Sequence, residues 1–291
     1  MNRVPSIDLK PYAQMFGGKE HAPISWDGGA PAALLLHGFP GTPAECRPLA
    51  EALHATGWSI RAPLLPGFGT DLASLLDRSY HDWVEAAALS LEMLLRDRAP
   101  VILVGHSMGA AIAAVIAGRY ASAAAALKGV VMVSPFTQLP NESLWTRVVR
   151  RGLRPFVKSI RPFRLLKLDD PSVIAGAREF APTLDLRDPA TRAQIENAAV
   201  PLSLFDQLAD LGRSASRSVS DIRIPTLVLQ GISDSLVPAR TTRRLVARLA
   251  GRLNYQEFAG GHDLLIDNRP AWPHVRETIL GFAAQIRNEQ P

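Results

Sequence analysis

Residues 101–109 read Val-Ile-Leu-Val-Gly-His-Ser-Met-Gly, and an alanine-rich stretch follows them as far as Tyr120. The four apolar residues at the start are typical of a short strand buried on both faces of a sheet. The alanine-rich stretch predicts a helix. Between them, Gly105 to Gly109 match the pattern G-x-S-x-G, in which a sharp strand-to-helix turn lifts the serine out of the sheet. The competing interpretation is a plain glycine-rich turn that carries no chemistry.

The alternation of strand and helix continues on both sides of this stretch. Short apolar runs that end at Gly or Pro predict further strands at Ala32–Leu36, Trp58–Ala62, Val130–Val133, Pro225–Leu229 and Leu253–Phe258. Helices are predicted at Ala44–Thr56, Tyr80–Arg98 and Ala239–Leu249 and from about Arg269, with a capping box formed by Ser79 and Asp82. This rhythm predicts an α/β protein with a mostly parallel central sheet flanked by helices.

The alternation stops between Phe136 and Ser220. This stretch shows helical periodicity and several prolines but no convincing buried strand. We therefore expect residues 1–136 and 221–291 to be the two parts of one α/β core. Residues 137–220 are expected to form a helical cap or lid inserted between them.

The composition is that of an ordinary globular domain and disfavours several protein classes. Of the 291 residues, 47% are hydrophobic and 20% are charged, which disfavours disorder and coiled coils. A single cysteine, Cys46, allows no internal disulfide and no thiolate-rich metal cluster, so the cytoplasm is the expected compartment. The sequence has no signal-peptide pattern, no apolar run long enough to span a bilayer, no phosphate-binding loop and no clustered metal ligands. We expect no cofactor.

A serine hydroxyl becomes a good nucleophile only when a neighbouring base takes its proton, and that base must be oriented by a third group. In the expected architecture the acid and then the histidine follow the serine along the chain, each just past the carboxyl end of a strand. Asp234 follows the predicted strand that ends at Leu229, and His262 follows the one that ends at Phe258. We therefore predict that Ser107, Asp234 and His262 are the nucleophile, the acid and the base.

The other candidates are weaker because of their positions. Three of the remaining histidines lie on predicted helices (His54, His81, His274), and His21 precedes the core. His37 lies at a turn, where a structural role is expected. The side chain of His106, the neighbour of the serine, is expected to point away from the site. The other carboxylates precede their strand (Asp221) or follow the histidine (Asp263, Asp267).

Acyl transfer places negative charge on a substrate oxygen, and N–H donors worth roughly 3 kcal/mol each must stabilise it. The candidate donors are the backbone amides of Met108, directly after the serine, and Phe39, where the first strand ends. Pro40 has no N–H and cannot serve. Phe39 and Phe136 are also predicted to contact the substrate, although Phe136, like Phe68, fits equally well as a packing residue.

Six parts of the sequence carry a resemblance to a known family: residues 34–45, the loop 65–70, Trp83, residues 105–109, residues 230–238 and residues 261–262. Together they resemble the α/β-hydrolase superfamily, and within it the bacterial carboxylesterases and monoacylglycerol lipases. The resemblance does not cover residues 137–220, and Phe68 stands where relatives usually have histidine. It implies a triad of Ser107, Asp234 and His262, an oxyanion hole at Phe39 and Met108, and a lid over an acyl pocket.

Positive charge is concentrated in the predicted insertion, although the net charge of the chain is only +5. Eight basic residues with no acid between them alternate there with apolar ones: Arg147, Arg150, Arg151, Arg154, Lys158, Arg161, Arg164 and Lys167. One interpretation is a solvated helical face over a substrate cleft, and the other is weak contact with a membrane or lipid surface. No nucleic-acid module accompanies the charge, so nucleic acid is not an expected partner.

These observations predict a serine hydrolase that cleaves carboxylic esters of short to medium acyl chains through an acyl-enzyme intermediate. A monoacylglycerol lipase, a thioesterase or an amidase would use the same triad with a different pocket and lid. The non-enzymatic alternative is a catalytically silent, ligand-binding relative, but such relatives usually lack a member of the triad. The expected partner is a small-molecule ester, and nothing in the sequence indicates an oligomeric state.

Overall fold

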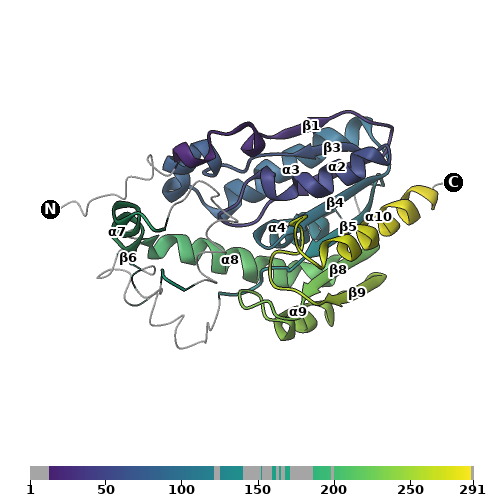
Figure 1. Ribbon diagram of the computed structural model, residues 1–291. Coiled ribbons are helices and arrows are strands. Elements are labelled where there is room, and N and C mark those ends of the chain that lie inside the picture. Colours follow the sequence, from purple (N-terminus) through teal and green to yellow (C-terminus); the bar gives the residue numbers. More distant parts are fainter. Residues whose placement is uncertain are drawn as a thin grey trace.

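A seven-stranded sheet forms the centre of the molecule (Figure 1). The computed structural model describes residues 13–120, 125–139, 152, 159–161, 164, 168–170, 186–197 and 200–289. The strands are β1 (Ile24–Trp26), β2 (Ala32–Leu36), β3 (Ser59–Ala62), β4 (Val101–His106), β5 (Leu127–Val133), β8 (Thr226–Gly231) and β9 (Leu253–Phe258). Their order across the sheet is β1-β3-β2-β4-β5-β8-β9, and all neighbouring strands are parallel except β1 and β3. The predicted mostly parallel α/β fold is confirmed.

Helices lie on both faces of this sheet. The α-helices are α2 (Arg47–Ala55), α3 (Tyr80–Asp97), α4 (Met108–Tyr120), α7 (Pro189–Asn197), α8 (Leu202–Ser218), α9 (Ala239–Val246) and α10 (Trp272–Asn288). Short 3-10 helices are η1 (Gln14–Phe16), η2 (Lys19–His21), η3 (Pro43–Cys46), η4 (Gly69–Asp77) and η6 (Val219–Asp221). A separate antiparallel pair consists of β6 (Ser159–Ile160) and β7 (Val200–Pro201).

Strand β2 shows how one strand contributes to two apolar cores. Successive side chains of a strand point to opposite faces of the sheet. Accordingly Ala32, Leu34 and Leu36 belong to a cluster with α3, α4 and α8, whereas Ala33 and Leu35 belong to a cluster with α2 and α10. All five residues are buried, which explains the unbroken apolar run in the sequence.

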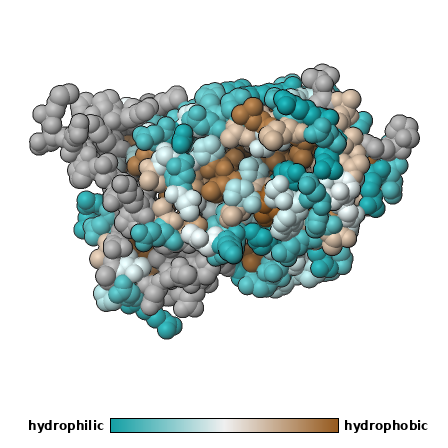
Figure 2. Space-filling model, turned by 90° about the horizontal axis from the view of Figure 1, so that it is seen from above, coloured by the Kyte–Doolittle hydropathy of each residue, from teal (hydrophilic) through white to brown (hydrophobic). Residues whose placement is uncertain are grey.

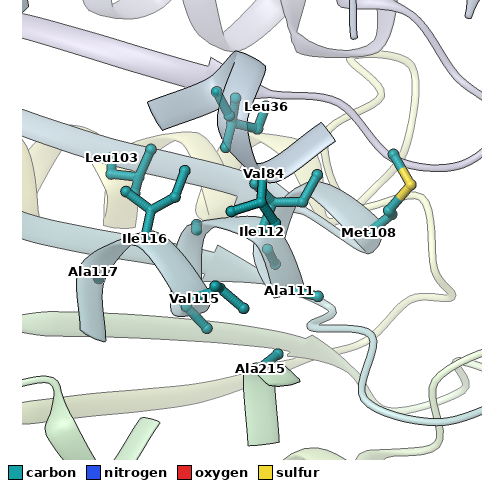
Figure 3. Packing of buried hydrophobic residues seen from close by; sticks show 14 of the residues in the cluster. Leu36, Val84, Leu103, Met108, Ala111, Ile112, Val115, Ile116, Ala117 and Ala215 are labelled. Carbon is teal, nitrogen blue, oxygen red and sulfur yellow. The ribbon is translucent and has the colours of Figure 1, made fainter. Parts of the chain in front are cut away.

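Helix α4 is the most deeply buried helix next to the site. Every residue from Met108 to Ala117 is buried, so the helix has no polar face, as expected for a helix packed on all sides. Figure 3 shows its side chains Ala111, Ile112, Val115, Ile116 and Ala117 among Leu36 and Leu103 of the sheet, Val84 of α3 and Ala215 of α8. The first turn of α4 is therefore held firmly against the end of β4.

The structure extends several predicted elements and adds three short strands, β1, β6 and β7. Strand β4 continues to His106 and β8 to Gly231, so both reach the loops that follow them. The capping box is confirmed, because Asp82 accepts a hydrogen bond from the N–H of Ser79 at 2.7 Å. The prediction missed β1, since a three-residue antiparallel edge strand is too short to show a periodic pattern.

The insertion region is described only in part. Helix α8 packs along α4, and its Leu204, Leu208 and Leu211 join the core cluster with α3 and α4. Most of the predicted basic, amphipathic stretch lies outside the described residues, which include only Arg161 and Arg164 of its eight basic residues.

Some large apolar side chains remain at the surface. Leu89 and Met93 of α3 are 61% and 68% exposed, and the face seen in Figure 2 shows apolar patches within a mainly hydrophilic surface. Of the helices in the described ranges, none is long and apolar enough to cross a membrane.

The two faces of α3 allow a matched test of this packing. Leu91→Ala removes a fully buried side chain, and we expect it to lower the free energy of unfolding by about 2–5 kcal/mol. Leu89→Ala makes the same change at an exposed position of the same helix and should change the free energy of unfolding by about 0.5 kcal/mol or less. Chemical denaturation measures both, and equal losses in the two variants would contradict the described orientation of α3.

Candidate active site

Three loops at one edge of the sheet bring the predicted residues together. Strands β4, β8 and β9 are parallel, so their carboxyl ends lie at the same edge. Ser107 directly follows β4, Asp234 lies three residues after β8, and His262 lies four residues after β9. The sheet itself therefore gathers residues that are far apart in the sequence.

Ser107 occupies a strained turn between β4 and α4. Its φ of 51° lies in the left-handed region, which residues other than glycine rarely adopt. Its N–H donates to the carbonyl of Val133 at 2.9 Å, and its carbonyl accepts from the N–H of Phe136 at 3.1 Å. These bonds to β5 and to the segment that follows it fix the backbone of the turn.

The two motif glycines are required by close approaches of the backbone. A Cβ on Gly105 would collide with the carbonyl of Gly109, and a Cβ on Gly109 would collide with the carbonyl of Leu36. The first turn of α4 can therefore lie directly against the ends of β2 and β4. This contact holds Ser107 at the top of the sheet, where its side chain keeps a small exposed surface.

Asp234 is held as a buried carboxylate. Its side chain is fully buried, and its Oδ1 accepts from the backbone N–H groups of Leu236 at 2.9 Å and Val237 at 2.7 Å. Its Oδ2 accepts from the side-chain amide of Gln230 at 3.1 Å. Burial by itself would raise the pKa of Asp234, but the hydrogen bonds from His262 and Val237 and the charge of His262 outweigh it, so the pKa lies below its usual 3.8.

His262 is oriented by this carboxylate. Its Nδ1 lies 2.8 Å from Oδ2 of Asp234, and since the carboxylate can only accept, Nδ1 carries the proton. The other ring nitrogen, Nε2, is then free to act as a base. Two backbone hydrogen bonds join the loop that carries Asp234 to the segment before His262. The N–H of Ile232 donates to the carbonyl of Phe258 and the N–H of Ser233 to the carbonyl of Gly260, both at 2.9 Å.

The residue before the serine connects His262 to the turn. The ring of His106 lies 4.9 Å from the ring of His262, centroid to centroid, and its Nε2 lies 3.0 Å from the carbonyl oxygen of His262. The prediction that His106 points away from the site is therefore wrong. Strand alternation directs its side chain away from that of Ser107, but the loop after β9 folds back over it.

The predicted N–H donors lie on either side of Ser107. Met108 begins α4, and the first N–H groups of a helix have no partner within the helix. Gly38, just before Phe39, passes directly over the serine, because a Cβ placed on Gly38 would lie 3.2 Å from Cβ of Ser107. The Phe39 and Met108 amides thus belong to the two segments that flank the nucleophile candidate.

The aromatic residues near this loop differ in their exposure. Phe39 and Phe136 are partly buried and pack against the core cluster. Phe68 is fully buried, with ring centroids 5.8 Å from Phe39 and 5.7 Å from Trp83, so it is a packing residue. A cavity is lined by residues 137–139, 235–238, 240 and 241. These lining segments follow Phe136 and Asp234 directly in the sequence.

His37 has the structural role that the sequence predicts. It is fully buried, its Nε2 accepts the N–H of Leu65 at 3.1 Å, and its Nδ1 lies 2.9 Å from the carbonyl of Gly38. Burial lowers the pKa of His37, which keeps the ring neutral in this role. The hydrogen bond between His37 and Leu65 links the loop after β2 to the loop after β3.

Sequence reasoning missed Glu45, which lies in η3 and reaches the same site. Its Oε1 accepts the N–H of Gly38 and lies 3.2 Å from Nδ1 of His106. Glu45 is part of the segment that carries the family resemblance, but no spacing rule connects it to His106, 61 residues away. In the described part of the chain, no group of three or more His, Cys, Asp and Glu side chains could hold a metal ion.

A comparison with known protein families shows which family the chain belongs to. The profile of the Hydrolase_4 family, described as serine aminopeptidase, S33, matches residues 30–269. The chain belongs to this family. As an S33 hydrolase it has the α/β-hydrolase fold, and the matched range includes Ser107, Asp234 and His262.

Two characterised bacterial proteins are similar to this S33 hydrolase in sequence. It is 27% identical over 219 residues to a thermostable monoacylglycerol lipase of Bacillus sp. (strain H-257), covering 73% of this chain and 81% of that lipase. It is 23% identical over 218 residues to a carboxylesterase of Bacillus subtilis (strain 168), covering 74% of this chain and 76% of that enzyme.

Solved structures share the fold of the S33 hydrolase. One described with LipS and LipT, two metagenome-derived lipolytic enzymes, matches with a TM-score of 0.71 and 19% identity over 92% of this chain and 98% of its own. The monoacylglycerol lipase of Paleococcus ferrophilus matches with a TM-score of 0.67 and 18% identity, over 91% and 98% of the two chains. At such identities the likeness shows the fold alone.

The lowered pKa of Asp234 predicts a specific loss of stability in acid. A carboxyl group whose pKa is lower in the folded than in the unfolded state stabilises the fold above its usual pKa, and this contribution is lost as the pH falls. Between about pH 5 and pH 3 the free energy of unfolding should therefore fall more steeply for the wild type than for Asp234→Asn.

Urea denaturation at several pH values measures this difference. Glu51→Gln, which removes an exposed carboxylate from α2, is the control and should follow the wild-type curve more closely. Parallel wild-type and Asp234→Asn curves would contradict the electrostatic description of Asp234.

Proposed function

We propose that this S33 hydrolase cleaves carboxylic esters of short to medium acyl chains through a Ser107–His262–Asp234 triad. The observation that carries the proposal is the 2.8 Å hydrogen bond between His262 Nδ1 and Asp234, at the same sheet edge as the strained turn of Ser107. A histidine held in this tautomer by a buried carboxylate, at the same sheet edge as a serine in a strand-to-helix turn, is the arrangement expected to activate a serine.

In the first step Ser107 Oγ attacks the ester carbonyl carbon while His262 Nε2 takes the hydroxyl proton. The resulting imidazolium is stabilised by the ionised Asp234, and it then protonates the departing alkoxide, which leaves as an alcohol. Water attacks the acyl-enzyme with His262 again as the base, and the carboxylic acid is released. The lowered pKa of Asp234 supports this role because the acid has to stay ionised throughout.

The tetrahedral intermediates place a negative charge on the former carbonyl oxygen. The N–H groups of Phe39 and Met108 are proposed to bind it, each contributing roughly 3 kcal/mol to transition-state stabilisation. The position of Gly38 over Ser107 and the start of α4 at Met108 support this assignment. The side chains of Phe39 and Phe136 are proposed to contact the acyl chain.

The charges next to the site favour an ester over a peptide with a free amino terminus. An aminopeptidase needs a carboxylate to bind the ammonium group of its substrate. Beside Ser107 and His262, the described carboxylates are already paired: Glu45 with His106, Asp234 with His262 and Asp263 with Arg269. The similarity to a carboxylesterase and a monoacylglycerol lipase points in the same direction.

A monoacylglycerol is the second candidate substrate, and the similarity to the Bacillus lipase favours it over a thioester or an amide. Residues 137–220 are proposed to act as the lid that selects the acyl chain, with α8 as the part packed on the core. We further propose that the basic stretch makes weak contact with lipid surfaces. The enzyme is proposed to be cytoplasmic and to need no cofactor.

Initial rates on p-nitrophenyl esters from acetate to palmitate test this function. We expect an optimum at short or medium chains and a loss of about 10⁵–10⁶-fold in kcat for Ser107→Ala at every length, with an unchanged circular dichroism spectrum. A long-chain optimum would favour the lipase. Equal rates for wild type and Ser107→Ala would exclude the triad.

A further inference from the structure

A buried ion pair lies beside the triad and is separate from it. The side chains of His106 and Glu45 are 8% and 15% exposed, and His106 Nδ1 lies 3.2 Å from Glu45 Oε1. The other ring nitrogen of His106 lies 3.0 Å from the backbone carbonyl oxygen of His262. Glu45 Oε1 also accepts the N–H of Gly38.

The hydrogen-bond partners of His106 define its charge. A carboxylate and a carbonyl oxygen can only accept, so each ring nitrogen of His106 has to donate. A neutral imidazole carries one N–H and can satisfy only one of these acceptors, whereas an imidazolium satisfies both. The lowered pKa of Glu45 keeps its side chain ionised, and its Oε1 accepts from Gly38 and from His106.

The charges around the pair agree with this assignment. Burial acts to lower the pKa of His106, but Glu45, the His262 carbonyl and Asp234 outweigh it, and the pKa is raised above its usual 6.5. For Glu45, burial acts to raise the pKa, but the charge and hydrogen bond of His106 and the N–H of Gly38 act in the other direction, and the pKa is lowered.

The uncharged neighbours of the pair do not compete for its proton. The ring of His37 is neutral because its Nε2 accepts the N–H of Leu65. Cys46, next to Glu45 in the chain, remains a thiol because burial raises its pKa. Neither His37 nor Cys46 therefore competes with Glu45 for the proton of His106.

Three segments of the proposed mechanism meet at this pair. Glu45 binds Gly38, the residue before the proposed oxyanion donor Phe39. His106 precedes Ser107 and holds the backbone of His262 through its carbonyl. One salt bridge between residues 61 positions apart thus links the oxyanion loop, the nucleophile and the base.

We propose that Glu45 and His106 are positioning residues, which act as an ion pair to align the oxyanion loop with Ser107 and His262. The proposal rests on the ester hydrolysis proposed above. It assigns neither residue to a chemical step, and it predicts that alignment is lost when His106 loses its proton. Activity should then have an alkaline limb set by His106.

The charge of His106 can be measured without turnover. In wild-type protein labelled with ¹⁵N-histidine, long-range ¹H–¹⁵N spectra report whether each ring nitrogen is protonated, and His106→Gln assigns the signal by its loss. We expect both nitrogens of His106 to be protonated at pH 6.5, the usual pKa of histidine, because the pKa of His106 is raised above it. A neutral His106 ring at that pH would overturn the proposal.

Kinetics test the positioning role. Glu45→Gln should lower kcat about 10-fold or more with little change in KM, and shift the alkaline limb toward lower pH, because the charge of Glu45 raises the pKa of His106. His106→Gln should remove that limb. Because the two residues act as a unit, the double variant should be no worse than the more impaired single variant.

The control is Glu51→Gln, which removes one exposed carboxylate from the neighbouring helix α2 and should leave kcat and the pH profile unchanged. Circular dichroism confirms folding of each variant, and the wild-type spectra decide the protonation even where a variant does not fold. Unchanged kcat and alkaline limb in folded Glu45→Gln and His106→Gln would overturn the proposal. Absence of Ser107-dependent turnover in the wild type would instead reject the proposed function, and the spectra would still decide the charge of His106.

Discussion

The close approach between the first turn of α4 and the ends of β2 and β4 is the constraint on which the rest of the site depends. No side chain fits at Gly105 or Gly109, because the backbones of Gly109 and Leu36 occupy the space. This contact forces Ser107 into a left-handed turn and directs the start of α4 toward the loop after β2. The apolar surroundings of α4 stabilise this strained geometry through packing on all sides.

Two carboxylate–histidine pairs lie at this sheet edge and share one backbone segment. Asp234 holds the ring of His262 through Nδ1, and His106, paired with Glu45, holds the carbonyl of the same residue. The Asp234 side chain is fully buried and the Glu45 side chain is only 15% exposed, so charge interactions are stronger there than in water and loss of a partner is costly. His262 is thus fixed by its side chain and by its backbone at once.

Much of the fold was predictable from sequence because buried parallel strands leave continuous apolar runs. The runs 101–104 and 32–36 mark strands, and the glycine pattern around Ser107 marks the turn between strand and helix. The positions of Asp234 and His262 follow from the rule that functional residues lie past the carboxyl ends of parallel strands. The hydrogen bond between Asp234 and His262 is observed in the structure.

The remaining features depend on contacts that no local pattern encodes. Glu45 meets His106 only because the fold brings η3 to the carboxyl end of β4, and the place of His106 next to the nucleophile did not predict its contact with His262. Strand β1 is defined by its pairing with β3 and has too few residues for a periodic signal. Phe68 could be assigned to packing only when its contacts with Phe39 and Trp83 were known.

Reaction with a fluorophosphonate tests the central claim most directly, because Ser107 Oγ would displace fluoride and form a bond to phosphorus that mass spectrometry can locate. The account predicts one adduct, on the peptide that contains Ser107, with no adduct in Ser107→Ala. Labelling of another residue, or equal labelling of the Ser107→Ala variant, would contradict it.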